Sequence, residues 1–216
     1  EMASCSSCLV VENNSSNNDD RGIYIGNSQN CSVRNNVVEK NAGYGLNLYD
    51  SRNCSVIGNT VQGGEKVGKK DWDAIGLYSC INCEVVGNTA SDSHSFGLWL
   101  ESSSNCLVDE NHMSNNMYSI ALHSSSTGCI IKRNNVRNSR GYSLQLYSSS
   151  INSFYHNNFI SPSVGQVESV GSANIMDNGV EGNFWSDYIG TDNNPPDGIG
   201  DTAYIIDGDE RDNYPL

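Results

Sequence analysis

The sequence is poor in helix-forming residues, and its apolar residues nowhere recur at i, i+3, i+4 and i+7 over a helical length. A helical repeat is therefore excluded. No run of 18 apolar residues occurs, so no membrane span is predicted. Basic residues are also few, with 12 Lys and Arg against 25 Asp and Glu and a net charge of −13. This charge argues against a nucleic-acid or anionic-membrane partner, because both would be repelled.

The sequence also shows no signal peptide at its start. It opens inside a repeat, at residues 1–5, with nothing that would cap the first edge of a sheet. Uncapped parallel edges promote aggregation. We therefore expect the chain to be part of a longer polypeptide that carries any targeting segment upstream.

The sequence does contain a repeated motif that is rich in Asn and Ser and is clearest at residues 45–61. One cysteine recurs at intervals of 23 residues, except for a 29-residue step that contains an insertion around residues 63–73, and Ser153 continues the column after 24. The cysteines in this column are Cys8, Cys31, Cys54, Cys83, Cys106 and Cys129. A fixed period in this range indicates one structural unit per repeat, stacked on its neighbours.

Each repeat alternates apolar and polar residues in short runs broken by Gly, Asn and Ser, which predicts strands and turns. Stacked in register, the strands form parallel sheets with about 4.8 Å between rungs, where a rung is one turn of the coil. One inward column is then Ile23, Leu46, Ile75, Leu98, Ile120 and Leu144, and another is Val10, Val33, Val56, Val85, Val108, Ile131 and Tyr155.

An asparagine follows each column cysteine by five residues. The set is Asn13, Asn36, Asn59, Asn88, Asn111, Asn134 and, after Ser153, Asn158. Asn tolerates the left-handed backbone of a sharp corner, and stacked amides can bond along the ladder. We therefore expect these residues to form the corners of the coil.

The repeat resembles that of right-handed parallel β-helix proteins, including carbohydrate-acting β-helices and the NosD-like family. The tail, at residues 182–188, 197–207 and 212–216, is similar to the closing segment of NosD-like domains in archaeal cell-surface proteins. The resemblance implies an all-β fold, a single-stranded right-handed parallel β-helix (solenoid) of about seven rungs with an irregular C-terminal cap. It also implies an extracellular or cell-surface location.

Two segments are expected within this fold. Residues 1–173 form the β-helix repeats, with an incomplete N-terminal end, and residues 174–216 form a last irregular rung and the cap. In the cap, Trp185, Tyr188, Tyr204 and Ile205 are predicted to cover the final rung.

The eight cysteines are interpreted as buried thiols. Neighbours in the column are one rung apart with parallel Cβ vectors, which does not suit a disulfide. Cys5 and Cys80 fall three residues before the column, and the two resulting Cys-x-x-Cys pairs are three rungs apart, so they cannot share a zinc ion. One disulfide or a bound metal remain as alternatives.

The outward residues of the first strand in each rung suggest a binding face. Tyr78, Glu101, His123 and Tyr147 are predicted to stand in one row with Trp99 beside them, and Trp72 lies in the nearby insertion. Aromatic rings stack on the apolar faces of sugars. We therefore predict a glycan-binding face, with Trp72, Tyr78, Trp99 and Tyr147 as substrate-binding residues. The alternative is an aromatic ladder that only stabilises the sheet.

An enzyme is the second hypothesis, with Glu101 and His123 as catalytic candidates. Hydrolysis of a glycoside needs two converging carboxyl groups, and Asp50 and Asp73 are the nearest partners for Glu101. A lyase or epimerase could instead use His123 as base, with Tyr78 or Tyr147 as acid and a lysine of the insertion against a uronate.

Metal binding is considered at two places. Asp192, Asn194, Asp197 and Asp201 offer closely spaced oxygen ligands around glycines, which suits Ca²⁺, although Asx turns are the alternative. A copper site lacks a visible His-Met cluster, because the remaining histidines, His94, His112 and His156, lie in separate columns.

The leading hypothesis is thus a rigid β-helix domain of a secreted or cell-surface protein that binds a polysaccharide or cell-envelope glycan. The second is a lyase, epimerase or glycoside hydrolase acting on a uronate-containing polysaccharide. The third is a metal-handling relative of the NosD-like proteins. The fold hosts all of these activities, so the choice depends on the site.

Overall fold

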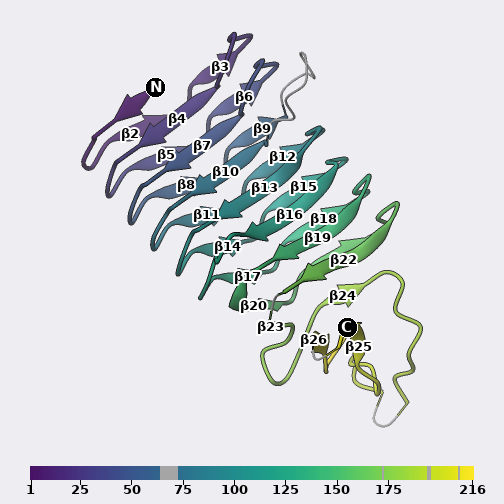
Figure 1. Cartoon of the computed structure of the whole chain (residues 1–216). Coiled ribbons are helices and arrows are strands. Elements are labelled where there is room, and N and C mark those ends of the chain that lie inside the picture. The colour runs from purple at the N-terminus through teal and green to yellow at the C-terminus, as the bar shows by residue number, and fades with distance from the viewer. Residues whose placement is uncertain (64–72, 172, 194–195, 209) are drawn as a thin grey trace.

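The computed structural model describes residues 1–63, 73–171, 173–193, 196–208 and 210–216. Within these residues all regular secondary structure is β, and no helix is long and apolar enough to cross a membrane. Figure 1 shows short strands stacked into a coil, from the purple N-terminal end to a yellow cap. Trp72, Asn194 and most of the insertion lie outside the described residues, so the predictions made for them are not addressed by the structure.

Three parallel sheets of eight strands each form the sides of the coil. The first sheet contains β1 (Met2–Ala3), β4 (Ile23–Gly26), β7 (Leu46–Tyr49), β10 (Ile75–Tyr78), β13 (Phe96–Glu101), β16 (Tyr118–His123), β19 (Tyr142–Tyr147) and β22 (Gly165–Val170). The second contains β2 (Leu9–Val11), β5 (Ser32–Arg34), β8 (Ser55–Ile57), β11 (Glu84–Val86), β14 (Leu107–Asp109), β17 (Ile130–Lys132), β20 (Ser150–Tyr155) and β23 (Ala173–Ile175). The third contains β3 (Asn14–Ser16), β6 (Val37–Glu39), β9 (Thr60–Gln62), β12 (Thr89–Ser91), β15 (His112–Ser114), β18 (Asn135–Arg137), β21 (Asn158–Ile160) and β24 (Phe184–Trp185).

Each strand pairs with the equivalent strand one turn away. Residues one repeat apart in the sequence therefore lie next to each other along the axis of the coil. Leu46 lies between Ile23 and Ile75 in the register of the first sheet. The side chains of this column are buried and form one core along the axis. The predicted parallel β-helix is confirmed, with about one turn more than the seven rungs expected.

The asparagine column forms a continuous hydrogen-bonded ladder inside the coil. Asn59 Oδ1 accepts hydrogen bonds from the backbone N and the Nδ2 of Asn36, both at 2.9 Å. Asn88 Oδ1 binds Asn59 in the same way. The stacked amides therefore bond from turn to turn, as predicted. The prediction that they supply the left-handed corner is wrong, because the residue before each one does, for example Asn35 with φ of 53° and Gly58 with φ of 63°.

The register after Cys129 differs from the prediction by one residue. Asn152, and not Ser153, follows Cys129 in the column, since its Oδ1 accepts a hydrogen bond from the Cys129 backbone amide at 2.9 Å. The spacing therefore remains 23 residues. As a result, the buried Phe154 replaces Tyr155 in the inward column, and the buried Asn157 replaces the exposed Asn158 in the ladder. The sequence alignment matched a small Ser to Cys, whereas the fold places an amide there that can continue the bonding.

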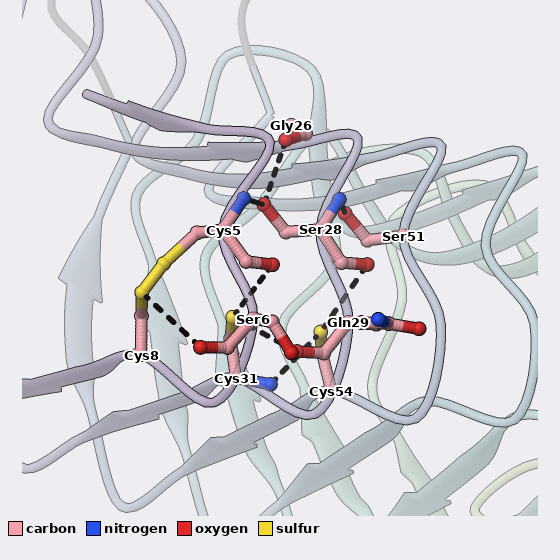
Figure 2. The surroundings of a disulfide bond; sticks show 9 residues. All are labelled: Cys5, Ser6, Cys8, Gly26, Ser28, Gln29, Cys31, Ser51 and Cys54. Carbon is pink, nitrogen blue, oxygen red and sulfur yellow. Dashed lines mark hydrogen bonds between the residues drawn. A yellow bond between two sulfur atoms is a disulfide. The ribbon is translucent and has the colours of Figure 1, made fainter.

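The prediction that all eight cysteines are thiols is wrong for two of them. Figure 2 shows a disulfide between Cys5 and Cys8, and the other six cysteines are free and buried. The prediction considered bridges between neighbouring rungs, where the Cβ vectors run parallel. Cys5 and Cys8 instead lie on one turn, at a corner that brings their Cα atoms to 6.1 Å, within disulfide range.

The C-terminal end is covered by an antiparallel hairpin of β25 (Tyr204–Asp207) and β26 (Glu210–Asp212). The Trp185 ring is stacked between Phe159 and Tyr204, with ring centroids 4.6 Å apart on each side. Tyr188 also packs against the core. Ile205 does not, because it is 61% exposed, and the neighbouring Ile206 packs inward in its place. The boundary predicted at residue 174 stays a prediction.

Candidate functional site

The predicted row of outward residues lies on the first sheet. Strand pairing places Tyr78 beside Glu101, Glu101 beside His123, and His123 beside Tyr147. They face outward because they alternate with the buried leucines of β10, β13, β16 and β19. The structure therefore brings together the four residues that the repeat period aligned.

Five half-buried rings form what we call the aromatic face, namely Phe96, Trp99, Tyr118, His123 and Tyr147. Trp99 is central, with its ring centroid 4.3 Å from that of Phe96 and 4.2 Å from that of His123. His123 continues the row to Tyr147 at 4.7 Å, and Phe96 stacks on Tyr118 at 5.1 Å. The rings follow one another across three consecutive turns of the coil.

Phe96 and Tyr118 were missed by the sequence reasoning, although a signal existed. Both stand two residues before an inward apolar residue of the first sheet, and Tyr44 and Tyr142 occupy the same column. The structure extends β13 and β16 to include them, so Phe96 pairs with Tyr118 in the register. Strict alternation gives Phe96 and Tyr118 the same parity as the inward Leu98 and Ile120, so the period-2 pattern alone could not assign their rings to the outer face.

His123 is held by a chain of hydrogen bonds to the next two turns. Its Nε2 lies 3.0 Å from Gln145 Oε1, and Gln145 Nε2 donates to Glu168 Oε2 at 2.7 Å. The Glu168 carboxylate can only accept hydrogen bonds, so the NH₂ group of Gln145 must face it. The Gln145 oxygen then faces His123 and accepts from its Nε2–H. Burial lowers the pKa of His123 from 6.5, so the imidazole is neutral at neutral pH with its lone pair on Nδ1.

Glu101, the other catalytic candidate, is engaged by its own strand. Its Oε2 accepts a hydrogen bond from Trp99 Nε1 at 3.2 Å. The carboxylate therefore fixes the indole that is central to the aromatic face. No hydrogen bond joins Glu101 to His123 among the described residues.

Asp73 and Tyr78 form a second polar pair at the edge of this face. Tyr78 Oη donates to Asp73 Oδ2 at 2.6 Å, and the Phe96 backbone amide donates to Asp73 Oδ1 at 3.4 Å. Burial raises the pKa of Asp73 to about 6, and the nearby Glu101 carboxylate adds to that rise. Burial also raises the pKa of Tyr78, which keeps its proton. Asp73 is thus buried, and the Tyr78 phenol is bonded to its Oδ2.

The acids of the tail are bonded to backbone amides. Asp192 accepts from Asp197 N at 3.0 Å and from Gly198 N at 2.8 Å, while Asp201 accepts from Asn193 N at 2.9 Å. The contact of the Asx-turn alternative is made by Asp197, whose Oδ1 accepts from Ile199 N at 3.0 Å. Among the described residues these carboxylates do not gather into a group of three around one point. The calcium site stays a prediction.

The fold and the outer face together define the class, a right-handed parallel β-helix repeat protein. A family model described as "Right handed beta helix region" matches residues 1–74. A second model, described as "Periplasmic copper-binding protein (NosD)", matches residues 70–190. Because this match spans more than half of the sequence, the chain belongs to the NosD family.

Several solved structures share the fold. A mutant of the periplasmic alginate epimerase AlgG has 15% identity and a TM-score of 0.72, over 80% of this chain and 45% of that one. The Azotobacter vinelandii mannuronan C-5 epimerase AlgE4 A-module has 14% identity and a TM-score of 0.56, over 79% and 58%. Pectate lyase Pel9A has 13% identity and a TM-score of 0.52, over 76% and 52%. At these identities the likeness shows the fold alone.

The chain spans about half the length of these solved structures. No curated protein sequence matches it.

The family description implies copper, which soft sulfur or imidazole ligands would bind. Within residues 70–190, the described side chains do not form a group of three His, Cys, Asp or Glu that could hold an ion. The group that does form, Cys5, Cys8 and Cys31, lies outside that match, and the disulfide occupies two of its sulfurs. The described residues of the matched segment thus offer copper no cluster of His, Cys, Asp and Glu, and no chemistry is assigned to copper.

Proposed function

We propose that this chain is the polysaccharide-binding β-helix domain of an extracytoplasmic protein, secreted or held at the cell surface, and part of a longer polypeptide. Residues 1–173 serve as the rigid rod and residues 174–216 as its last turn and cap. The aromatic face is the surface that binds the glycan.

The observation that carries this proposal is the row of rings from Phe96 to Tyr147. Phe96 lies beside Trp99 on β13, and the row continues through His123 on β16 to Tyr147 on β19, with neighbouring ring centroids 4.2 to 4.7 Å apart and all four rings half-buried. Such a strip offers stacking surface to sugar rings, with the Glu101 carboxylate beside it as a polar partner. An alginate epimerase and a pectate lyase, both named for polysaccharide substrates, share the fold.

Binding is tested with soluble polysaccharides by calorimetry and by quenching of tryptophan fluorescence. We expect Trp99→Ala to weaken binding by about tenfold or more, which is the loss of one stacking contact. Tyr155→Ala is the matched control, because Tyr155 is a half-buried outward aromatic on the second sheet. Equal loss in both variants, or no binding by the wild type, contradicts the proposal.

The second candidate is a lyase or epimerase on a uronate-containing polysaccharide. It is favoured by one observation, the neutral His123 with an unshared pair on Nδ1 beside the Tyr147 ring. An assay for new reducing ends and unsaturated products separates the two functions. Product that His123→Ala abolishes establishes the enzyme, whereas binding without product establishes the module. Glu101→Gln separates a hydrolase from both, since a hydrolase needs that carboxyl group.

A further inference from the structure

A small cavity opens on the first sheet beside the aromatic face, on the turns of β4, β7 and β10. Its volume is about 140 Å³, and we name it the Arg21 pocket after the one basic residue among the described residues of its wall. The lining residues are Arg21, Tyr24, Tyr44, Asn47, Tyr49 and Tyr78. Tyr78 also pairs with Glu101 on β13, the strand that carries Phe96 and Trp99, so the pocket adjoins the aromatic face.

Asn47 is the unusual residue of this pocket. Its side chain is 2% exposed, and neither Nδ2 nor Oδ1 has a hydrogen-bond partner in the described part of the chain. Buried amides are almost always bonded, so an unpaired one indicates a place that a ligand or water completes. On the next turn a Cβ at Gly76 would lie 2.6 Å from Asn47 Nδ2, so the absence of a side chain there makes room for the amide.

Arg21 supplies positive charge at the mouth of the pocket. Its guanidinium carbon lies 4.5 Å from the centroid of the Tyr24 ring and 6.0 Å from that of Tyr44. The ion pair that it makes with Asp20 is long, at 3.9 Å, and both side chains are exposed. An exposed pair of this kind is weak, which leaves the guanidinium available to another anion.

The walls between these two groups are phenol rings. Tyr24 lies along its own strand, since a Cβ at Gly26 would be 2.5 Å from Tyr24 Oη. Tyr49 stands at the opening, 48% exposed, with its ring 6.5 Å from Tyr78. Asn47 and Tyr49 alternate with the buried leucines of β7, so both side chains belong to the outward face on which the pocket opens.

The pocket therefore combines a cation, an unpaired amide and ring surfaces. We propose that the Arg21 pocket binds the carboxylate of an acidic sugar, a uronate unit of the glycan that lies on the aromatic face. The guanidinium and Asn47 Nδ2 donate to the carboxylate, and the phenol rings contact the sugar ring. Since the whole chain carries a charge of −13, attraction of a polyanion depends on this local site.

This inference rests on the proposed glycan binding, so the experiment separates the two. Calorimetry compares an oligosaccharide of uronic acids with its neutral counterpart, using wild type, Arg21→Gln, Asn47→Leu, Trp99→Ala and Arg34→Gln. Arg34 is an exposed arginine on the second sheet and serves as the matched control. The monosaccharides glucuronate and glucose are compared in parallel by NMR shifts of the protein.

We expect wild type and Arg34→Gln to prefer the acidic oligosaccharide by about tenfold, the effect of one charge-assisted contact. Arg21→Gln should lose the preference but keep the neutral affinity, whereas Trp99→Ala should weaken both ligands alike. Asn47→Leu should bind the acidic sugar less well yet unfold at the same or a higher temperature, because it removes an unpaired buried amide. A merely structural Asn47 would lower the unfolding temperature.

An acidic preference that Arg21→Gln leaves unchanged overturns the inference while leaving the proposed function intact. Loss of all oligosaccharide binding in the wild type overturns the proposed function. In that case, protein NMR signals of Tyr24, Tyr44 and Tyr49 that shift on addition of glucuronate still support the proposed carboxylate site. If they do not shift, the inference about the Arg21 pocket is overturned as well.

Discussion

Asp212 in the cap accepts a hydrogen bond from the backbone amide of Asn183 at 2.6 Å. Asn183 is the last member of the asparagine ladder, since its Oδ1 accepts from Asn157. The column of Cys129 and Asn152 ends in the same manner, since Asn152 N donates to Asn174 Oδ1 at 3.1 Å and Asn174 N donates to Glu210 Oε1 at 2.7 Å. The hydrogen bonds between stacked amides thus continue from turn to turn. In these two columns the last backbone amide donates to a carboxylate of β26.

Because Asp212 accepts the last hydrogen bond of the asparagine ladder, we expect the Asp212→Ala variant to be much less stable. Asp212 is fully buried and also accepts from Trp185 Nε1 at 2.9 Å, so its removal leaves several buried donors unpaired. We expect a loss of about 3 kcal/mol or more in the free energy of unfolding, measured with urea. Asp207→Ala is the control, because Asp207 is an exposed residue of the same hairpin. Similar losses in both variants would contradict the role of the ladder end.

The buried Asp73 predicts a pH dependence of stability. Burial raises its pKa from 3.8 in the unfolded chain to about 6 in the fold, so between these values the folded state retains a proton that the unfolded state has lost. The contribution of Asp73 to stability therefore falls as the pH rises through this window, by up to about 3 kcal/mol, and is level above it. Asp73→Asn should remove this slope in urea unfolding, and a slope that is unchanged would contradict the assignment.

The hydrogen bond to Gln145 predicts the state of His123. Its ¹⁵N NMR signals should show the Nε2–H tautomer at neutral pH, and protonation should occur only below pH 6.5 because burial disfavours the cation. The exposed His112 provides a reference in the same spectrum. An Nδ1–H tautomer would mean that Gln145 does not accept from His123, and would remove the base proposed for the enzyme.

The cysteines predict a definite thiol count. Denatured protein kept without reductant should react at six thiols, and reduction should raise the number to eight, since Cys5 and Cys8 form the one disulfide among the described residues. The bridge closes a very short loop, so the double variant Cys5→Ser/Cys8→Ser should lose only about 2 kcal/mol. Eight reactive thiols before reduction would contradict the bridge.

The calcium prediction for the tail is tested by metal analysis of protein purified without chelator. If Ca²⁺ binds at Asp192, Asp197 and Asp201, chelation should lower the Tm, and Asp201→Asn should abolish that response. An unchanged Tm and the absence of bound metal would leave these acids as partners of backbone amides only.

Much of the fold could be predicted because, in a solenoid, the length of the sequence repeat decides which residues are in contact. Residues one period apart become vertical neighbours, as Leu48 and Leu77 are, and the alternation of apolar residues decides which side chains point inward. The same logic placed Tyr78, Glu101 and His123 in one row. It failed where the residue type of a column changed from Cys to Asn, and so assigned Ser153 to the place that Asn152 occupies.

The sequence by itself determined the period, the all-β class, the inward columns and the outward row, because each follows from spacing along the chain. Only the tertiary structure decided that Glu101 binds Trp99, that Cys5 joins Cys8, and that Asn47, beside Arg21, finds no hydrogen-bond partner among the described residues. These depend on rotamers and on the space between side chains of adjacent turns. A repeat period specifies the turn and the face of a residue, but not the direction in which its polar atoms point.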